Sequence, residues 1–133
     1  MFLYRPVGLR ELELIAQTGF TAFPPRLPEQ PIFYPVLNFE YAQQIARDWN
    51  TQSDSFAGFV TKFEVEDNYV AKFEVQVVGS RIHQELWIPA EELTEFNNHI
   101  IGKITIEAAY YGENFQEDID LEKNLPTSIS MTL

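Results

Sequence analysis

The chain has 133 residues, no cysteine and a formal net charge of −11 at pH 7, from 20 acidic and nine basic residues. This length predicts a single domain that folds without a disulfide or a metal. The acidic balance argues against nucleic acid or an anionic membrane surface as a partner. The absence of cysteine excludes disulfides and thiolate chemistry, and it suits a reducing cytoplasm. Because only two histidines are present, we expect no metal centre.

The predicted elements of the first half alternate between strand and helix. Residues 2–7 favour a strand, and apolar residues at helical spacing predict a helix over 8–20 that Gly19 ends. Arginines interrupt this N-terminal stretch, so we expect neither a signal peptide nor a membrane span. The prolines of 22–31 predict an extended surface crossing, because proline fits neither a helix interior nor a central strand. A second strand is expected over 32–37.

The second half begins with a helix over 38–50, for which Asn38 is the expected N-cap. From Gly58 onward the apolar residues alternate with period two, which predicts strands. These strands are expected at 58–65, 72–78, 81–89 and 103–112, with a two-residue turn at Gly79 and Ser80 and a helix over 89–100 that Gly102 ends. The order of elements predicts an α+β domain with antiparallel sheets and about three helices.

The stretch IHQELWIP, residues 82–89, combines apolar and chemically active side chains. On an alternating strand, His83, Glu85 and Trp87 share one face, while apolar side chains dominate the other. The shared face is either a solvated surface or the floor of a binding cleft.

Three features, in this order, resemble the ADP-ribosyltransferase fold, a family of small split-sheet domains that bind NAD. Arg5 in LYRPV matches the position on the first strand that holds the dinucleotide. IFYPVLNFEYAQQIA resembles the strand and helix of the nicotinamide pocket, with Phe33 or Tyr34 at the aromatic place. HQELWIP resembles the strand that presents the catalytic glutamate, with Glu85 at that position.

The resemblance covers roughly residues 3–112 and has clear departures. The pocket strand has no Ser-Thr-Ser run and contains Pro35, and His83 stands where arginine-directed transferases carry a first Glu or Gln. The whole chain is also similar to a family of small bacterial proteins of unknown function labelled "ADP-ribosylation/crystallin J1". The ADP-ribosylglycohydrolases to which the second half of that label points are larger, mostly helical proteins, which this chain does not resemble.

The resemblance implies a role for each candidate residue. Glu85 would stabilise the positive charge that develops on ribose as nicotinamide leaves, with His83 as a candidate general base beside it. Arg5 would hold the pyrophosphate or ribose through its rigid fork of donors. The aromatic residue of the pocket strand would stack on nicotinamide, and Trp87 would form a wall of the same cleft.

The same residues also fit purely structural roles. Arg5 could pair with a carboxylate, Tyr34 could pack in the core, and Glu85 could face a cation on a neighbouring strand. His83 fits the solvent side of a strand as well as it fits a general base. The residue types alone do not decide between the two sets of roles.

Two classes of function therefore stay open. The first is an NAD-dependent ADP-ribosyltransferase or an NAD-hydrolysing protein, which requires Arg5 and Glu85 to converge on one pocket and leaves the protein target undefined. The second is a non-catalytic binding or interaction domain on the same fold, marked by a solvent-facing Glu85 and an exposed aromatic patch around Tyr110 and Tyr111. An acidic, protein-mimicking partner ranks third, on charge alone.

Residues 113–133 are expected to form an acidic extension of a domain spanning 1–112. GENFQEDIDLEK carries five carboxylates against one lysine, which is typical of a solvated segment. The extension could end in a short strand.

Overall fold

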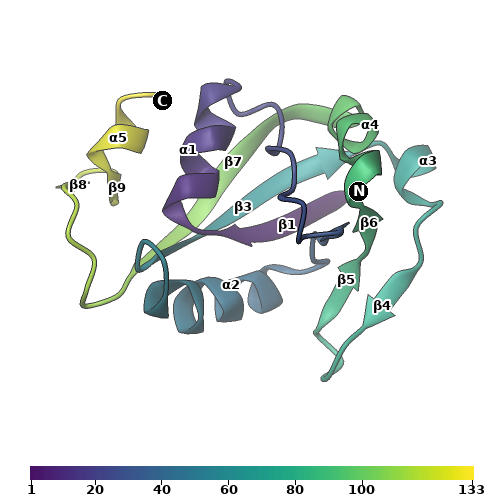
Figure 1. Ribbon diagram of the computed structural model, residues 1–133, viewed down its shortest axis with the longest axis horizontal. Coiled ribbons are helices and arrows are strands. Elements are labelled where there is room, and N and C mark those ends of the chain that lie inside the picture. Colours follow the sequence, from purple (N-terminus) through teal and green to yellow (C-terminus); the bar gives the residue numbers. More distant parts are fainter.

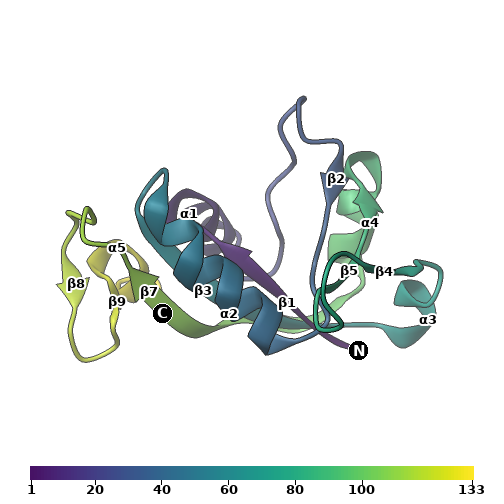
Figure 2. The ribbon, with the colours of Figure 1, turned by 90° about the horizontal axis from the view of Figure 1, so that it is seen from below.

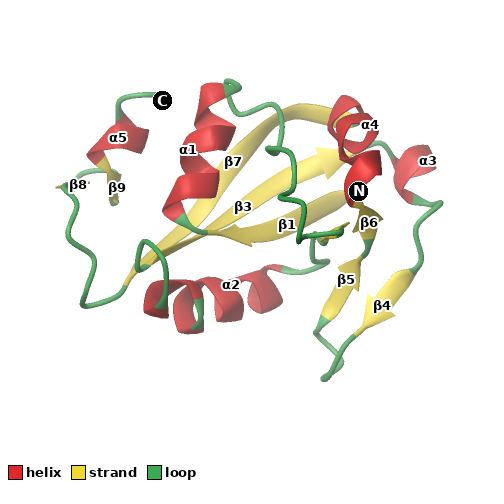
Figure 3. Ribbon diagram, in the orientation of Figure 1, coloured by secondary structure: helices red, strands yellow, loops and turns green.

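The computed structural model describes residues 1–133 and is an α+β arrangement of five helices and several small antiparallel sheets. Its centre is a sheet of three long strands (Figures 1 and 3). These are β1 (Phe2–Val7), β3 (Ala57–Val65) and β7 (Ile100–Tyr111), in the order β1–β3–β7. The register between β1 and β3 is unbroken, so consecutive side chains of β1 alternate strictly between the two faces of the sheet.

Two helices cover opposite faces of the central sheet (Figure 1). Helix α1 (Leu9–Gln17) packs the apolar side that its sequence spacing predicts against the main core. Helix α2 (Phe39–Asp48) places Ala42 and Ala46 against Val60 on the other face, in a separate apolar cluster. Each face of the sheet therefore has its own packing environment.

The predicted ends of these helices are confirmed. Asn38 caps α2, because its side-chain oxygen accepts a hydrogen bond from the backbone N–H of Tyr41 at 2.8 Å. Gly19 follows α1 in a left-handed conformation with φ of 75°. Its N–H and that of Phe20 donate back to carbonyls of the last turn of α1, which is a Schellman ending.

Beyond β1 the sheet continues only through two isolated bridges. Tyr4 pairs with Val36, and Val36 pairs with Glu85. Glu85 belongs to β5 (Gln84–Leu86), which forms a hairpin with β4 (Val75–Val77). Figure 1 shows this hairpin beside one end of β1, with the two parts of the sheet diverging from there.

Proline explains why the sheet divides at this point. Tyr4 both donates to Val36 and accepts from it, at 2.9 and 2.7 Å. Because backbone groups point to alternate edges along a strand, Pro6 turns its nitrogen toward the same edge as Tyr4. Pro6 has no N–H to donate, so the ladder cannot be extended past Tyr4. The chain therefore leaves the edge of β1 and opens a space beside its C-terminal half.

None of the helices is both long and apolar enough to cross a membrane. Most of the remaining short elements lie around the second part of the sheet, while the 3₁₀ turn after α2 packs on α2 and β3. These elements are β2 (Ile32–Phe33), which pairs with β6 (Ile88–Pro89), the 3₁₀ turns η1 (Asn50–Gln52) and η2 (Ala90–Glu92), and the helices α3 (Asp67–Val70) and α4 (Leu93–Asn98).

Several predicted boundaries are wrong. There are five helices rather than about three, because α3 and α5 (Thr127–Ser130) are single turns that a periodicity of 3.6 cannot reveal. The strand predicted over 72–78 is reduced to β4. The strand predicted over 81–89 divides into β5 and β6.

The two glycine predictions in this half are also wrong. The hairpin turn is longer than the two residues Gly79 and Ser80, because the last backbone bond before it runs from the N–H of Val78 to the carbonyl of His83. Gly102 lies inside β7, with φ of 71°, at a shift in the register between β7 and β3, and does not end α4. It therefore allows a bulge in a strand instead of stopping a helix.

The C-terminal segment packs on the main core. It forms β8 (Ile119–Asp120), β9 (Leu125–Pro126) and then α5, at the end of the molecule opposite the β4–β5 hairpin (Figures 1 and 2). Leu125 and Ile129 are buried in the main core. Most of the carboxylates in residues 113–122 stay at the surface, as the composition predicts.

Gly58 should tolerate no side chain, because a Cβ atom there would lie 2.1 Å from the carbonyl oxygen of Ala46 in α2. We expect Gly58→Ala to lower the free energy of unfolding by about 3 kcal/mol, measured by urea denaturation. Gly102→Ala is the control, since its Cβ meets open space and it adds only left-handed strain of about 1 kcal/mol. Equal effects of the two substitutions would show that α2 does not pack this closely on β3.

Ile129→Ala should destabilise the whole domain if the C-terminal segment belongs to the core. We expect a loss of about 3 kcal/mol in the same measurement, since a fully buried isoleucine would be replaced by a cavity. Leu121→Ala, at an exposed position of the same segment, should change the stability by less than about 0.5 kcal/mol. A neutral Ile129→Ala would mean that residues 113–133 are dispensable for folding.

Candidate functional site

Arg5 and Glu85 are the only charged residues that are buried, with 5% and 8% of their surfaces exposed. They lie on opposite faces of the sheet. Glu85 is in one cross-strand row with Val36 and Tyr4, on the face covered by α2. Arg5 follows Tyr4 directly, so its side chain points to the face that carries the main core. The structure therefore does not bring Arg5 and Glu85 into one pocket.

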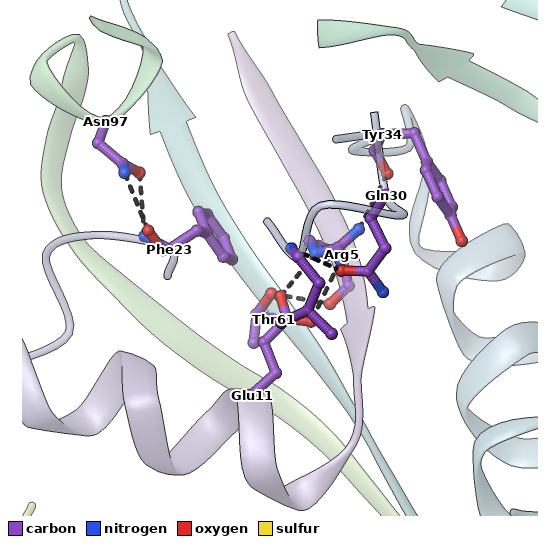
Figure 4. A network of polar contacts seen from close by, with 8 residues as sticks. Arg5, Glu11, Phe23, Gln30, Tyr34, Thr61 and Asn97 are labelled. Atoms are coloured by element: carbon purple, nitrogen blue, oxygen red, sulfur yellow. Dashed lines mark hydrogen bonds and ion pairs between the residues drawn. The ribbon is translucent and has the colours of Figure 1, made fainter. Parts of the chain in front are cut away.

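Arg5 is held in a specific ion pair. Its Nε and one terminal nitrogen donate to the two carboxylate oxygens of Glu11 at 2.8 and 3.1 Å (Figure 4). Its other terminal nitrogen donates to the backbone carbonyl of Tyr34 at 3.4 Å. The guanidinium carbon lies 4.6 Å from the centre of the Phe33 ring. Paired fork-to-fork with a carboxylate and backed by an aromatic ring, this guanidinium has a defined orientation.

A cavity of about 810 Å³ opens beside this pair, where the two parts of the sheet separate. Its walls come from the C-terminal half of β1, the start of α1, the proline-rich crossing and the loop after α2. Three arginines and two carboxylates carry the charge of its lining: Arg5, Arg10, Arg26, Glu11 and Asp54. The cavity is within the range of about 300–1,000 Å³ that is usual for small-molecule sites.

Phe33 and Tyr34, the two candidates for the aromatic position, lie in different environments. Phe33 is fully buried, and its ring packs against those of Phe23 and Phe96 in the main core. Tyr34 is 38% exposed and lines the cavity, with its ring centre 5.4 Å from the guanidinium of Arg5. Tyr34 is therefore the ring that a ligand in the cavity could contact.

Sequence reasoning missed Arg26, which lies in the proline-rich crossing. The crossing is fixed at its start, because Asn97 of α4 pairs with both backbone groups of Phe23 at 2.9 and 3.0 Å (Figure 4). A turn between Leu27 and Gln30 then directs the chain back toward β2. Arg26 is half-buried between these points. The stretch PPRLP contains no signal that it folds over β1, so the sequence could not assign Arg26 to the site.

The other candidate residues gather on the α2 face. The carboxylate of Glu85 accepts hydrogen bonds from the Tyr41 hydroxyl at 2.8 Å and from the Trp87 indole at 2.7 Å. His83 stacks on Tyr41, with ring centres 4.5 Å apart, and its Nε2 lies 2.9 Å from the side-chain oxygen of Gln44. The predicted grouping of His83, Glu85 and Trp87 is thus present, and Tyr41 from α2 completes it.

The chemistry of this group is that of a buried carboxylate held by uncharged donors. Burial, and then the hydrogen bond to Glu85, raise the pKa of Tyr41 well above its usual value, so its hydroxyl donates throughout the neutral range. Trp87 is 44% exposed and forms the outer side of the group. Glu85 faces neither open solvent nor a cation.

Tyr110 and Tyr111 do not form the exposed aromatic patch that would mark an interaction domain. Both are only partly exposed. The Tyr110 hydroxyl accepts a hydrogen bond from Gln43 at 2.8 Å, and the Tyr111 hydroxyl donates to the carbonyl of Asn124 at 2.8 Å. Tyr111 thereby attaches the C-terminal segment to the central sheet.

In comparisons with known proteins, no family model, no curated protein and no solved structure matches this chain. The resemblance to the ADP-ribosyltransferase fold stays a prediction that rests on the motifs of the sequence.

Tyr41→Phe should reveal how strongly the buried carboxylate depends on its donors. The substitution leaves one oxygen of Glu85 without its hydrogen bond, so we expect the free energy of unfolding to fall by about 2 kcal/mol in urea denaturation at pH 7. Tyr34→Phe is the matched control, because Tyr34 is 38% exposed and its hydroxyl forms no hydrogen bond within the protein, so its loss should be nearly neutral. If both variants unfold at the wild-type urea concentration, the Tyr41–Glu85 hydrogen bond contributes nothing to stability.

Proposed function

We propose that this protein is a binding domain for an anionic nucleotide, with NAD as the first candidate, and that the ligand occupies the cavity beside Arg5. The supporting observation is the charge of the cavity. The chain has only nine basic residues and a net charge of −11, yet three arginines line this one space against two carboxylates, so its lining carries a formal charge of +1. Because an acidic protein repels an anion in general, such a local concentration of cations is the feature that a nucleotide phosphate requires.

The remaining lining suits the organic part of a nucleotide. Tyr34 offers one face of an aromatic ring, and Leu14, Leu27 and the prolines of the crossing add apolar surface. Side chains from the loop after α2, including Asn50 and Ser53, add hydrogen-bonding groups. An apolar wall with a few polar groups and a cationic end is the usual composition of a cofactor site.

Catalysis by Glu85 is the second candidate function. One observation favours it: the carboxylate is fixed by Tyr41 and Trp87, and Trp87 is partly exposed. Such a carboxylate could stabilise positive charge on a ribose brought to the α2 face. That site would not use Arg5, which lies on the other face. Binding without group transfer is therefore the function that the geometry supports best.

A thermal-shift titration with NAD tests the proposal, using alanine substitutions of two exposed aromatic residues, one that lines the cavity and one that contacts Glu85. We expect NAD at a hundred times its dissociation constant to stabilise the wild type by about 2.7 kcal/mol, which raises Tm by several degrees. Tyr34→Ala should weaken binding about fivefold to tenfold through the loss of stacking. Trp87→Ala should leave the NAD affinity unchanged.

The opposite pattern would contradict the proposal. Binding that survives Tyr34→Ala and is lost in Trp87→Ala would place NAD beside Glu85 and favour the catalytic candidate. Release of nicotinamide that disappears in Glu85→Gln would then establish that candidate. The absence of any shift at millimolar NAD would remove NAD as the ligand.

A further inference from the structure

Arg26 differs from Arg5 in having no partner for its inner nitrogen. The Nε atom of Arg26 is shielded from solvent and has no hydrogen-bond partner in the protein. A shielded donor without an acceptor is unfavourable, and such groups are rare in folded proteins unless a ligand or water completes them. Arg26 also lines the cavity, and none of its nitrogens takes part in a hydrogen bond or ion pair within the protein, so its guanidinium can bind a molecule there.

Arg5 cannot supply the same free donors. Its Nε and one terminal nitrogen are engaged by Glu11, and its other terminal nitrogen points to the carbonyl of Tyr34. A ligand would have to displace Glu11 in order to pair with Arg5 fork-to-fork. The Arg5–Glu11 pair therefore forms a fixed wall, while Arg26 keeps a guanidinium for an incoming anion.

The electrostatic surroundings of Arg26 point in the same direction. Burial, and then the positive charge of Arg5, lower the pKa of the Arg26 guanidinium, and Glu11 only partly opposes them. Two like charges are thus held near each other at the edge of the cavity. An anion between them would relieve the repulsion and pair with the guanidinium of Arg26, which has no partner in the protein.

We propose that Arg26 is the phosphate-binding residue of this cavity and that the anion it takes is the diphosphate of a nucleotide. This inference rests on the proposed nucleotide site and assigns the anchoring role to Arg26 instead of Arg5. A guanidinium pairs with phosphate oxygens through two parallel hydrogen bonds, which a planar fork provides and a point charge does not. The exposed Arg10 at the rim can meet a second phosphate, and the size of the cavity leaves room for an organic group against Tyr34.

Isothermal titration with inorganic pyrophosphate and, separately, with NAD tests this assignment. The variants are Arg26→Gln and Arg26→Lys, and the control is Arg47→Gln, which removes an arginine from the surface of α2 outside the cavity. We expect Arg26→Gln to weaken both ligands at least tenfold and Arg47→Gln to leave both unchanged. Arg26→Lys should recover part of the pyrophosphate affinity, which loss of folding would not allow. The melting temperature without ligand should not fall in Arg26→Gln, because an unpaired donor has been removed.

Each contrary result has a distinct meaning. Wild-type pyrophosphate affinity in Arg26→Gln overturns the role of Arg26. NAD binding without pyrophosphate binding, unchanged in Arg26→Gln, overturns the diphosphate anchor and leaves the nucleotide proposal standing. Pyrophosphate binding that depends on Arg26, without NAD binding, keeps the anion site and removes NAD. If the wild type binds neither ligand, both proposals fail.

Discussion

Pro6 has no N–H to offer at the edge of β1, and the sheet divides where that donor is missing. Up to Tyr4 the sheet is continuous with Val36 and β5, and beyond it the chain must leave. The space that opens is closed on one side by α1 and on another by the proline-rich crossing. The cavity therefore lies beside a central strand, and the anchored crossing and the loop after α2 complete its walls.

The chemistry of that cavity depends on how one buried charge is satisfied. Arg5 is removed from water, which is unfavourable for a cation unless its donors and charge are matched. Glu11 accepts two hydrogen bonds from Arg5 and balances its charge. Glu11 lies in the first turn of α1, where the helix dipole also favours a carboxylate. The same pairing takes Arg5 out of competition for a ligand. Arg26 lies in the crossing that Asn97 anchors, and its guanidinium has no partner in the protein. Arg26 is therefore the cation that can pair with a ligand.

The sequence predicts which residues are candidates for the site, and it cannot predict the face on which each one lies. Arg5 and Glu85 were singled out from motifs, and they are the two charged residues that the fold buries. Asn38 begins α2 and Gly19 ends α1 as predicted, because capping depends on neighbours within a few positions. The placement of Glu85 depends instead on the row Tyr4–Val36–Glu85, which joins segments about 30 and 50 residues apart. No local pattern encodes that register, so the convergence expected for a transferase could not be tested from the sequence.

The most direct test of this account is a crystal structure of the protein with NAD. The account predicts the diphosphate within hydrogen-bonding distance of Arg26, a ring of the nucleotide against Tyr34, and the Arg5–Glu11 pair intact. The group formed by Tyr41, Glu85 and Trp87 should be unchanged on the other face of the sheet. NAD bound on that face, against Trp87 and with its ribose at Glu85, would contradict the account and favour a catalytic glutamate.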